Sequence, residues 1–303
     1  MKQRISIICA ILMMVLFVVG CGPAQTGTTG ATHQVTDGTG TIVTMPNEPK
    51  RIVPIAASTE DIVLSLVDPN RVAAVGTVPN NVPDASAKVE KHVKASAESI
   101  LSVQPDLVLV PNWISPDAIG EMRNMQIPVY VYKTPTTVEE AKATIHEIAG
   151  LLHASDESMI ASMDADLKTV EELANKYSGE RPLVAFYSQF GLTGGKGSTF
   201  DDMCKYLKVN NAAAQVGLGS FDNGTREDLI KSNPDIIFIP SVAYTSDGTT
   251  PATVEQLYSD PALQGVKAIS NRRVFLVDSS QVMSYSQFMT RAMVSMAQNI
   301  YSM

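Results

Sequence analysis

The sequence contains only three cysteines in 303 residues, at positions 9, 21 and 204. Cys9 lies in an apolar N-terminal segment and Cys21 directly follows it, so Cys204 is left without a disulfide partner in the rest of the chain. This excludes a small disulfide-stabilised fold, and stability must come from hydrophobic cores. Cys204 lies at helical spacing beside Phe200 and Met203, which predicts a buried small hydrophobe rather than a nucleophile.

Basic residues and histidines are also few. Lys and Arg number 23 against 31 Asp and Glu, a net charge of −8, so the surface is poorly suited to nucleic acid. The four histidines, at positions 33, 92, 146 and 153, do not have the spacing of metal ligands. We therefore expect no resident metal ion and no nucleic-acid partner.

Long apolar runs are absent except at residues 5–19, which follow two basic residues. This run is short for a membrane span and lacks a basic stop, so residues 1–20 are predicted to be a signal peptide. Its end, VVGC, resembles the lipobox of a bacterial lipoprotein, with Val where Leu is more usual. The resemblance implies lipidation of Cys21, and an ordinary cleaved signal peptide is the alternative. Residues 21–33 are small, polar and rich in Gly and Thr, as a flexible tether would be.

The stretch ESILSVQPDLVLVP, residues 98–111, has a counterpart in EDLIKSNPDIIFIP, residues 227–240. Both copies open with Glu, reach a Pro-Asp pair seven residues later and continue with four apolar residues and a second Pro. Because Pro disfavours helix in the residue before it, each helix should end near Gln104 or Asn233. The apolar runs suit strands that are buried on both faces. Each copy is therefore predicted to be a helix, a turn and a strand of a parallel sheet.

One long helical stretch separates two α/β segments of the chain. The predicted boundaries are 34–153 for an N-terminal lobe, 154–179 for an inter-lobe helix and 180–303 for a C-terminal lobe. Alternation of residue types predicts a single edge strand at residues 34–43. The first helix of the N-terminal lobe is expected to start at Ser58 or Thr59, because both are good N-cap residues.

Four separated segments resemble the solute-binding proteins of ABC importers for iron complexes and cobalamin. They are KRIVPIAASTEDIVLSL, SAESILSVQPDLVLVP, GLTGGKGSTFDDMCKYLKVNNAA and TREDLIKSNPDIIFIP, in family order, and the resemblance covers residues 34–303. It implies an α/β fold of two doubly wound, Rossmann-like lobes joined by a single long rigid helix, the class III periplasmic-binding architecture. It also implies a monomer outside the cytoplasm, on the cell surface or in a periplasm, that delivers a ligand from its inter-lobe cleft to a permease dimer.

The resemblance assigns a role to the first residue of each repeated unit. In the family, one surface Glu on each lobe docks into a basic pocket of the permease, and the matching residues are Glu98 and Glu227. An alternative is structural: Ser96 and Thr225 resemble N-caps, and a Glu two residues later suits the positive end of a helix. Both roles are compatible with each other.

Ligand-binding candidates follow from loop position, because ligands of open α/β sheets lie beyond the carboxyl ends of the strands. Trp113, the only Trp in the chain, lies in a loop between two prolines. Arg291 departs from the family pattern, which often has Pro directly before this Arg, where Thr290 stands here. The candidates are Ala57, Ser58, His92, Asn112 and Trp113 in the N-terminal lobe, and Tyr187, Thr193, Gly194, Lys196, Phe221, Ser241, Tyr244, Tyr285 and Arg291 in the C-terminal lobe.

These candidates favour one class of ligand. Anionic ferric siderophores are usually met by Arg or Lys, and the candidate loops carry only Lys196 and Arg291. Large corrinoids need aromatic and small polar walls, which favours a cobalamin-type ligand, with a ferric siderophore or haem as the alternatives. An exported chelatase-like enzyme on a related two-lobe fold is the competing function. It should show converging acid and base residues, whereas His92 stands alone, so we expect a binding protein with no catalytic residue and no cofactor.

Overall fold

The computed structural model describes residues 31–77, 80–241 and 253–301. Cys21, most of the predicted tether and Tyr244 lie outside these ranges, so the predictions made for them rest on the sequence. Within the same ranges, no helix is both long enough and apolar enough to cross a membrane.

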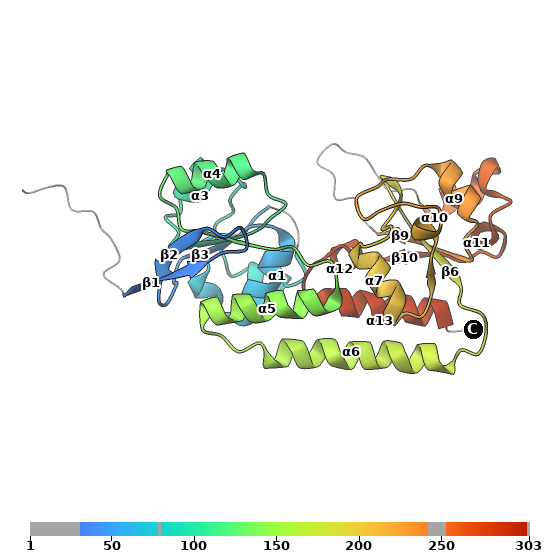
Figure 1. The fold of residues 1–303 in the computed structure, drawn as a ribbon, viewed down its shortest axis with the longest axis horizontal. Helices are drawn as coiled ribbons and strands as arrows, with labels where there is room; N and C mark the ends of the chain where they lie inside the picture. Colours follow the sequence, from blue (N-terminus) through green and yellow to red (C-terminus); the bar gives the residue numbers. More distant parts are fainter. Residues whose placement is uncertain (1–30, 78–79, 242–252, 302–303) are drawn as a thin grey trace, which may run out of the picture. The chain divides into compact units, whose positions relative to one another are not determined.

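The N-terminal lobe is built on a parallel sheet in the order β3-β4-β5. All residues of these strands are buried, because α1 and α5 cover one face of the sheet and α3 and α4 cover the other (Figure 1). The strands are β3 (Ile52–Pro54), β4 (Leu107–Pro111) and β5 (Val129–Tyr132). The helices are α1 (Ala57–Leu66), α2 (Pro83–Ser86), α3 (Ala97–Leu101), α4 (Pro116–Asn124) and α5 (Val138–Leu152), with a 3₁₀ turn at Pro69–Arg71.

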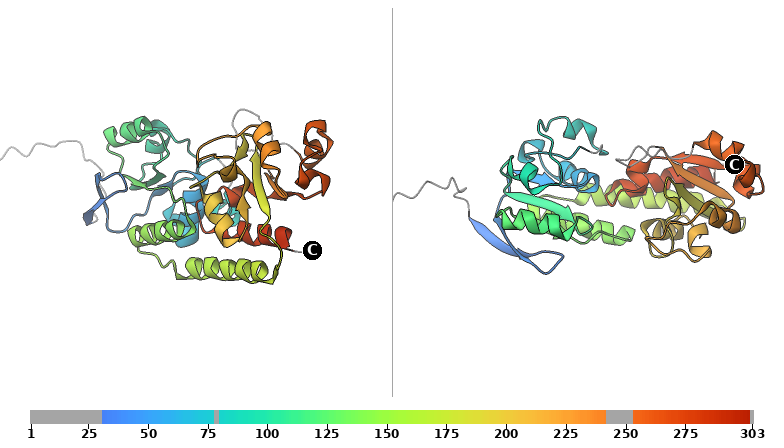
Figure 2. Two further views of the ribbon diagram at one scale, coloured as in Figure 1. Left: turned by 45° about the vertical axis from the view of Figure 1, so that its right-hand side comes forward. Right: turned by 90° about the horizontal axis from the view of Figure 1, so that it is seen from above.

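The prediction of a single edge strand at residues 34–43 is wrong. The segment belongs to a hairpin of two antiparallel strands at the outer edge of this lobe (Figure 2). Its strands are β1 (Thr32–Thr36) and β2 (Ile42–Pro46). The prediction overlooked the turn signal Asp37-Gly38. The Asp37 carboxylate accepts hydrogen bonds from the amides of Thr39 (2.9 Å) and Thr41 (3.0 Å), which closes the turn.

Asp37 also attaches the hairpin to the lobe. Its carboxylate has no exposed surface, pairs with Arg123 and accepts a hydrogen bond from the amide of Val131. Burial by itself raises the pKa of Asp37, but the hydrogen bonds from Thr39, Thr41 and Val131 outweigh it and leave the pKa below its ordinary value.

We expect Asp37→Ala to lower the free energy of unfolding by about 2–4 kcal/mol at neutral pH, because it leaves a partly buried guanidinium and several amides unpaired. A depressed folded-state pKa contributes stability above the unfolded pKa of about 4, and this contribution disappears as pH falls through the folded value. Urea denaturation at about pH 7 and about pH 3 should therefore show a difference between wild type and variant that shrinks in acid. Glu121→Ala, at an exposed carboxylate of α4, is the control, and equal losses for both variants would contradict the prediction.

The C-terminal lobe is built on a sheet in the order β10-β9-β6-β7, and β8 also pairs with β6. β10, β9, β6 and β8 are parallel, whereas β7 folds back antiparallel to β6. The strands are β6 (Leu183–Ser188), β7 (Gly191–Thr193), β8 (Asn210–Asn211), β9 (Ile236–Pro240) and β10 (Val274–Val277). The helices are α7 (Thr199–Tyr206), α8 (Ala212–Gln215), α9 (Arg226–Ser232), α10 (Val254–Ser259), α11 (Lys267–Ser270), α12 (Ser279–Val282) and α13 (Phe288–Tyr301), with a 3₁₀ turn at Pro261–Leu263.

The two copies of the repeated unit have the same structure, and the predicted helix, turn and strand are confirmed as α3 with β4 and α9 with β9. The residue before each Pro has a positive φ, 48° at Gln104 and 50° at Asn233. The Asp of each Pro-Asp pair then holds the start of the neighbouring strand. Asp106 accepts hydrogen bonds from two amides just before β3 (2.7 and 2.9 Å), and Asp235 accepts one from the first amide of β6 (2.8 Å).

A single unbroken helix, α6 (Glu157–Lys176), connects the lobes as predicted. Its 20 residues span roughly 30 Å, and it runs beside both lobes, below α5 and α13 (Figure 1). Its buried residues, Met159, Met163, Val170 and Ala174, face this side, and α6 packs along α13. One continuous apolar cluster contains side chains of α5, α6, α7 and α13. The lobes therefore share a core, which limits how far they can separate.

Candidate ligand-binding cleft

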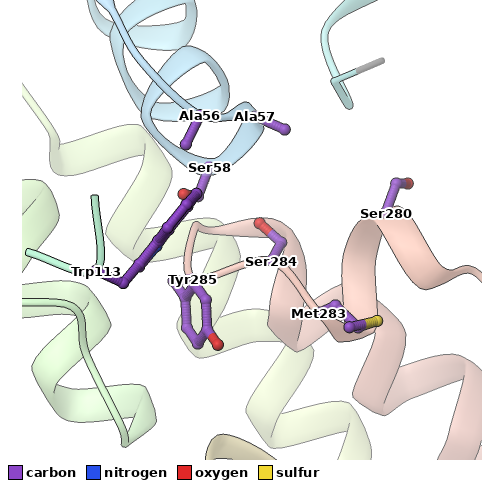
Figure 3. Close-up of a pocket in the computed structure, with 8 residues that line it drawn as sticks. All are labelled: Ala56, Ala57, Ser58, Trp113, Ser280, Met283, Ser284 and Tyr285. Carbon is purple, nitrogen blue, oxygen red and sulfur yellow. The ribbon is translucent and has the colours of Figure 1, made fainter. Parts of the chain in front are cut away.

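One pocket lies between the lobes, and a second adjoins it in the C-terminal lobe. The first has a volume of about 400 Å³ and is lined by Ala56, Ala57, Ser58 and Trp113 of the N-terminal lobe and by Ser280, Met283, Ser284 and Tyr285 of the C-terminal lobe (Figure 3). The second, of about 310 Å³, is lined by described residues of the C-terminal lobe alone, Met283 and Tyr285 among them. Because the pockets share these two side chains, we refer to them together as the cleft.

The N-terminal wall of the cleft is formed at the carboxyl ends of β3 and β4. Ala56 has a φ of 85° and turns the chain sharply from β3 into α1, which places small residues at the cleft. The expected start of α1 at Ser58 or Thr59 is therefore wrong. Thr59 lies within the helix, and its hydroxyl donates a hydrogen bond to the carbonyl of Ile55 (2.6 Å), which precedes the helix. Trp113 follows β4 and is 58% exposed.

The C-terminal wall includes the β6–β7 turn and residues 220–223, besides α12 and the turn after it. Phe190, at the turn, is 49% exposed, and Phe221 is 94% exposed. The Gly-rich segment allows the two chain segments to approach closely. A Cβ on Gly191, which has a φ of 93°, would lie 2.0 Å from the carbonyl oxygen of Gly224, and one on Gly195 would lie 2.2 Å from that of Leu218.

The cleft lining is aromatic, apolar and hydroxyl-bearing, with little charge. Among the described lining residues there is no Lys, Arg or His, and Asp222 is the single charged side chain. The Asp222 carboxylate accepts a hydrogen bond from the amide of Gly219 (2.6 Å). Burial raises the pKa of Tyr285, so its hydroxyl stays protonated at neutral pH. The lining therefore suits a ligand surface that is large and mostly uncharged.

A buried carboxylate ties the two lobes together beside the cleft. Asp61 of α1 is fully buried, and it accepts hydrogen bonds from Asn81, through its amide (2.7 Å) and its side chain (2.8 Å). Two hydroxyls of the C-terminal lobe also donate to it, Ser286 at 3.0 Å and Ser284 at 3.3 Å. Burial raises the pKa of Asp61 in spite of these hydrogen bonds. Because Ser284 lines the cleft, this network couples the lobe interface to the site.

The neighbouring carboxylate, Glu60, is 1% exposed and remains within the N-terminal lobe. It accepts hydrogen bonds from the amide of Gly76 (2.7 Å) and from the side chain of Asn80 (2.7 Å). Burial raises the pKa of Glu60, and the nearby charge of Asp61 adds to this effect. Sequence reasoning identified neither carboxylate, since acidic residues early in a helix are normally exposed.

Half of the predicted ligand-binding residues line the cleft. They are Ala57, Ser58 and Trp113 of the N-terminal lobe and Thr193, Gly194, Phe221 and Tyr285 of the C-terminal lobe. Sequence reasoning missed Phe190, Met283, Ser284 and Ser280. For Phe190 a signal was present, because this aromatic residue stands directly before the Gly-rich segment. The other three lie on α12 and the turn after it, whose position depends on packing.

The other predicted residues do not line these two pockets. In the N-terminal lobe, the ring of His92 forms a hydrogen bond with the carbonyl of Gly76 (2.9 Å) in a separate pocket. Asn112 accepts a hydrogen bond from the amide of Thr134 (3.0 Å).

In the C-terminal lobe, Tyr187 is half-buried against the core, whereas Lys196 and Ser241 are exposed. Arg291 lies on α13 and is exposed, and its guanidinium stacks 5.1 Å from the ring centre of Phe288. Tyr244 lies outside the described residues.

Glu98 and Glu227 occupy equivalent positions in the two lobes. Ser96 and Thr225 are the N-caps of α3 and α9, as expected, so each Glu is the second residue of its helix. Both are exposed, and neither carboxylate makes a hydrogen bond or ion pair with a described residue. In Figure 1 both helices lie on the side of the lobes away from α6.

Two further observations concern metal ligands and the free thiol in the described part of the chain. No cluster of three or more His, Cys, Asp or Glu there could hold a metal ion. Cys204 is 3% exposed, and burial raises the pKa of its thiol, which agrees with the predicted role as a small core residue.

Comparison with known proteins places the chain in a family. Residues 52–281 match the profile of the periplasmic binding protein family. The chain is 28% identical to the uncharacterized ABC transporter substrate-binding lipoprotein YvrC of Bacillus subtilis, over 321 aligned positions that cover 99% of this chain and 98% of the relative. It is 24% identical over 226 positions to a cobalamin-binding protein of Halobacterium salinarum, a match that covers 72% of this chain but only 61% of that relative.

Solved structures show the same fold at low sequence identity. The heme-binding protein HmuT superposes with a TM-score of 0.74 at 18% identity, covering 93% of this chain and 94% of that one. The apo form of the periplasmic heme-binding protein RhuT from Roseiflexus sp. RS-1 superposes with a TM-score of 0.69 at 21% identity, covering 84% of this chain and 98% of that one. Two doubly wound lobes, one connecting helix and a match over most of the sequence lead to one conclusion: this chain belongs to the periplasmic binding protein family.

Proposed function

We propose that this protein is an extracytoplasmic solute-binding lipoprotein that captures a metal chelate in the cleft and delivers it to an ABC importer. Membership of the periplasmic binding protein family and the similarity to a substrate-binding lipoprotein along the whole chain support binding and delivery rather than catalysis. Lipidation of Cys21 after removal of residues 1–20 would hold the protein at the outer face of the membrane.

The preferred ligand is a cobalamin-type corrinoid, and the main support is the aromatic cleft, whose described lining has no basic residue and a single charged one, Asp222. Its volumes lie within the range of small-molecule sites, and Trp113, Phe190, Phe221 and Tyr285 supply flat apolar surfaces. An anionic ferric siderophore, or the carboxylates of haem, would need basic partners, which the described lining lacks. The serines and Tyr285 can bind the amide groups of a corrinoid. The name of the Halobacterium relative points to the same ligand class.

Delivery is proposed to occur through Glu98 and Glu227. Each carboxylate is exposed and unpaired among the described residues, and each lies at the same position of the repeated unit. A two-fold permease dimer presents the same surface twice, so equivalent acidic contacts from the two lobes match its symmetry.

Calorimetric titration of the mature chain with cyanocobalamin tests the proposal, with ferrichrome, ferric enterobactin and haem as competitors. We expect micromolar or tighter binding of the corrinoid and weakening by about 10- to 100-fold in Trp113→Ala and in Phe221→Ala, because each removes a large stacking surface. Leu276→Ala is the control, since this residue is 56% exposed and lies outside the cleft lining.

Tight binding of a ferric chelate without corrinoid binding would overturn the ligand assignment but leave the importer proposal in place. Failure of all four compounds to bind would contradict capture of a metal chelate altogether.

A further inference from the structure

The repeated unit contains more than its fold requires. Most of its shared positions serve the fold, because Ile100 and Leu229 are fully buried, the residue before each Pro adopts a positive φ, and each Asp holds a neighbouring strand. Two pairs of residues are exposed and take no part in these contacts. One is Glu98 with Glu227, and the other is Leu101 with Ile230.

Leu101 and Ile230 are large apolar side chains left in solvent, 43% and 38% exposed. Both stand three residues after the Glu of their unit, and side chains at this spacing lie on the same face of a helix. Each lobe therefore presents an acidic and an apolar side chain together. Other exposed apolar residues, such as Met125 and Leu276, lie outside the repeated unit.

We propose that Leu101 and Ile230 are the apolar half of a docking footprint whose acidic half is Glu98 and Glu227, and that its occupant is the permease dimer. This inference rests on the proposed docking of the two glutamates. Charge complementarity identifies the partner surface as basic, and the duplication of the footprint fits a two-fold partner. The permease would place an apolar surface beside each basic pocket.

The two halves of the footprint have different physical effects. Exposed charges steer association and are screened by salt, so Glu98 and Glu227 act mainly on the association rate. Apolar contacts form only in the docked complex and depend little on ionic strength, so Leu101 and Ile230 act mainly on the dissociation rate. This difference makes the two contributions separable by experiment.

The test measures binding of the mature chain to its ABC permease dimer in lipid nanodiscs, by surface plasmon resonance at several salt concentrations. We expect Leu101→Gln with Ile230→Gln to raise the dissociation rate roughly tenfold or more, with the association rate and its salt dependence unchanged. Glu98→Gln with Glu227→Gln should lower the association rate and remove most of its salt dependence. Met125→Gln with Leu276→Gln, also one exposed apolar residue per lobe, is the matched control.

The thermal unfolding temperature of each variant shows whether it folds. Leu101→Ala with Ile230→Ala is a second variant, which shortens both side chains without making them polar. Both double variants at Leu101 and Ile230 could dissociate at the wild-type rate while the variant at Glu98 and Glu227 associates more slowly. That result would show that the apolar half of the footprint is wrong and that docking through the glutamates stands. If the Glu variant also binds like wild type, the proposed docking itself is wrong.

Discussion

Replacing Asp61 by alanine is expected to lower the free energy of unfolding by about 3–5 kcal/mol. The substitution removes the acceptor of two hydrogen bonds from Asn81 and of two from Ser284 and Ser286, all in a fully buried setting. It should also weaken ligand binding, because Ser284 lines the cleft and loses the contact that holds it against the N-terminal lobe. Urea denaturation and calorimetry measure the two effects. Asp84→Ala, at an exposed carboxylate of α2, is the control.

The pH dependence of this loss gives a sharper test. Burial raises the folded-state pKa of Asp61, so its contribution to stability is fully present below the unfolded pKa of about 4 and decreases as pH rises through the folded value. The difference between wild type and Asp61→Ala should therefore be larger at about pH 4 than at about pH 7, opposite to the trend expected for Asp37. Asp61→Asn, which cannot ionise, should lack this part of the pH dependence. A difference that grows towards neutral pH would contradict the assignment.

Charge reversal at Glu98 and Glu227 is expected to reduce transport by about 100-fold or more while ligand affinity stays unchanged. Arg at these positions would face the basic pockets proposed on the permease, and like charges at an interface cost several kcal/mol. Little effect on the fold is expected, because neither carboxylate has a hydrogen bond or ion pair with a described residue.

Uptake of radiolabelled cyanocobalamin into cells that depend on this protein measures the effect, and each single reversal should have an intermediate result. Glu171→Arg with Glu172→Arg, on the exposed face of α6, keeps the same change in net charge and should transport normally. Normal uptake by the Glu98→Arg, Glu227→Arg protein would exclude docking through these residues. Loss of ligand affinity in the same protein would point to a structural role instead.

Patterns within single elements allowed most of the architecture to be predicted. The buried runs of β4 and β9 and the Pro-Asp pairs after α3 and α9 were identifiable because strand burial and proline sterics act over a few residues. The long helix α6 was identifiable because its apolar residues recur every three or four positions. The hairpin of β1 and β2 was missed although its Asp-Gly turn is also a local signal.

The site was less predictable, because its residues come from segments that only folding brings together. Asp61 and Ser284 are 223 positions apart in sequence, and nothing near either residue indicates the other. Trp113 follows the end of β4 and Phe221 precedes the second copy of the repeated unit, so both could be assigned by loop position, whereas Met283 and Ser284 depend on how α12 packs. Arg291 matched a family position, yet its place on α13 leaves it stacked on Phe288.

The sequence by itself therefore determined the two α/β segments, the connecting helix and the duplicated unit, since each depends on the periodicity and sterics of contiguous residues. The tertiary structure alone decided which side chains line the cleft, that Asp61 bonds across the lobe interface and that Leu101 and Ile230 remain in solvent. These features depend on burial and on contacts between distant segments, which short-range patterns do not encode.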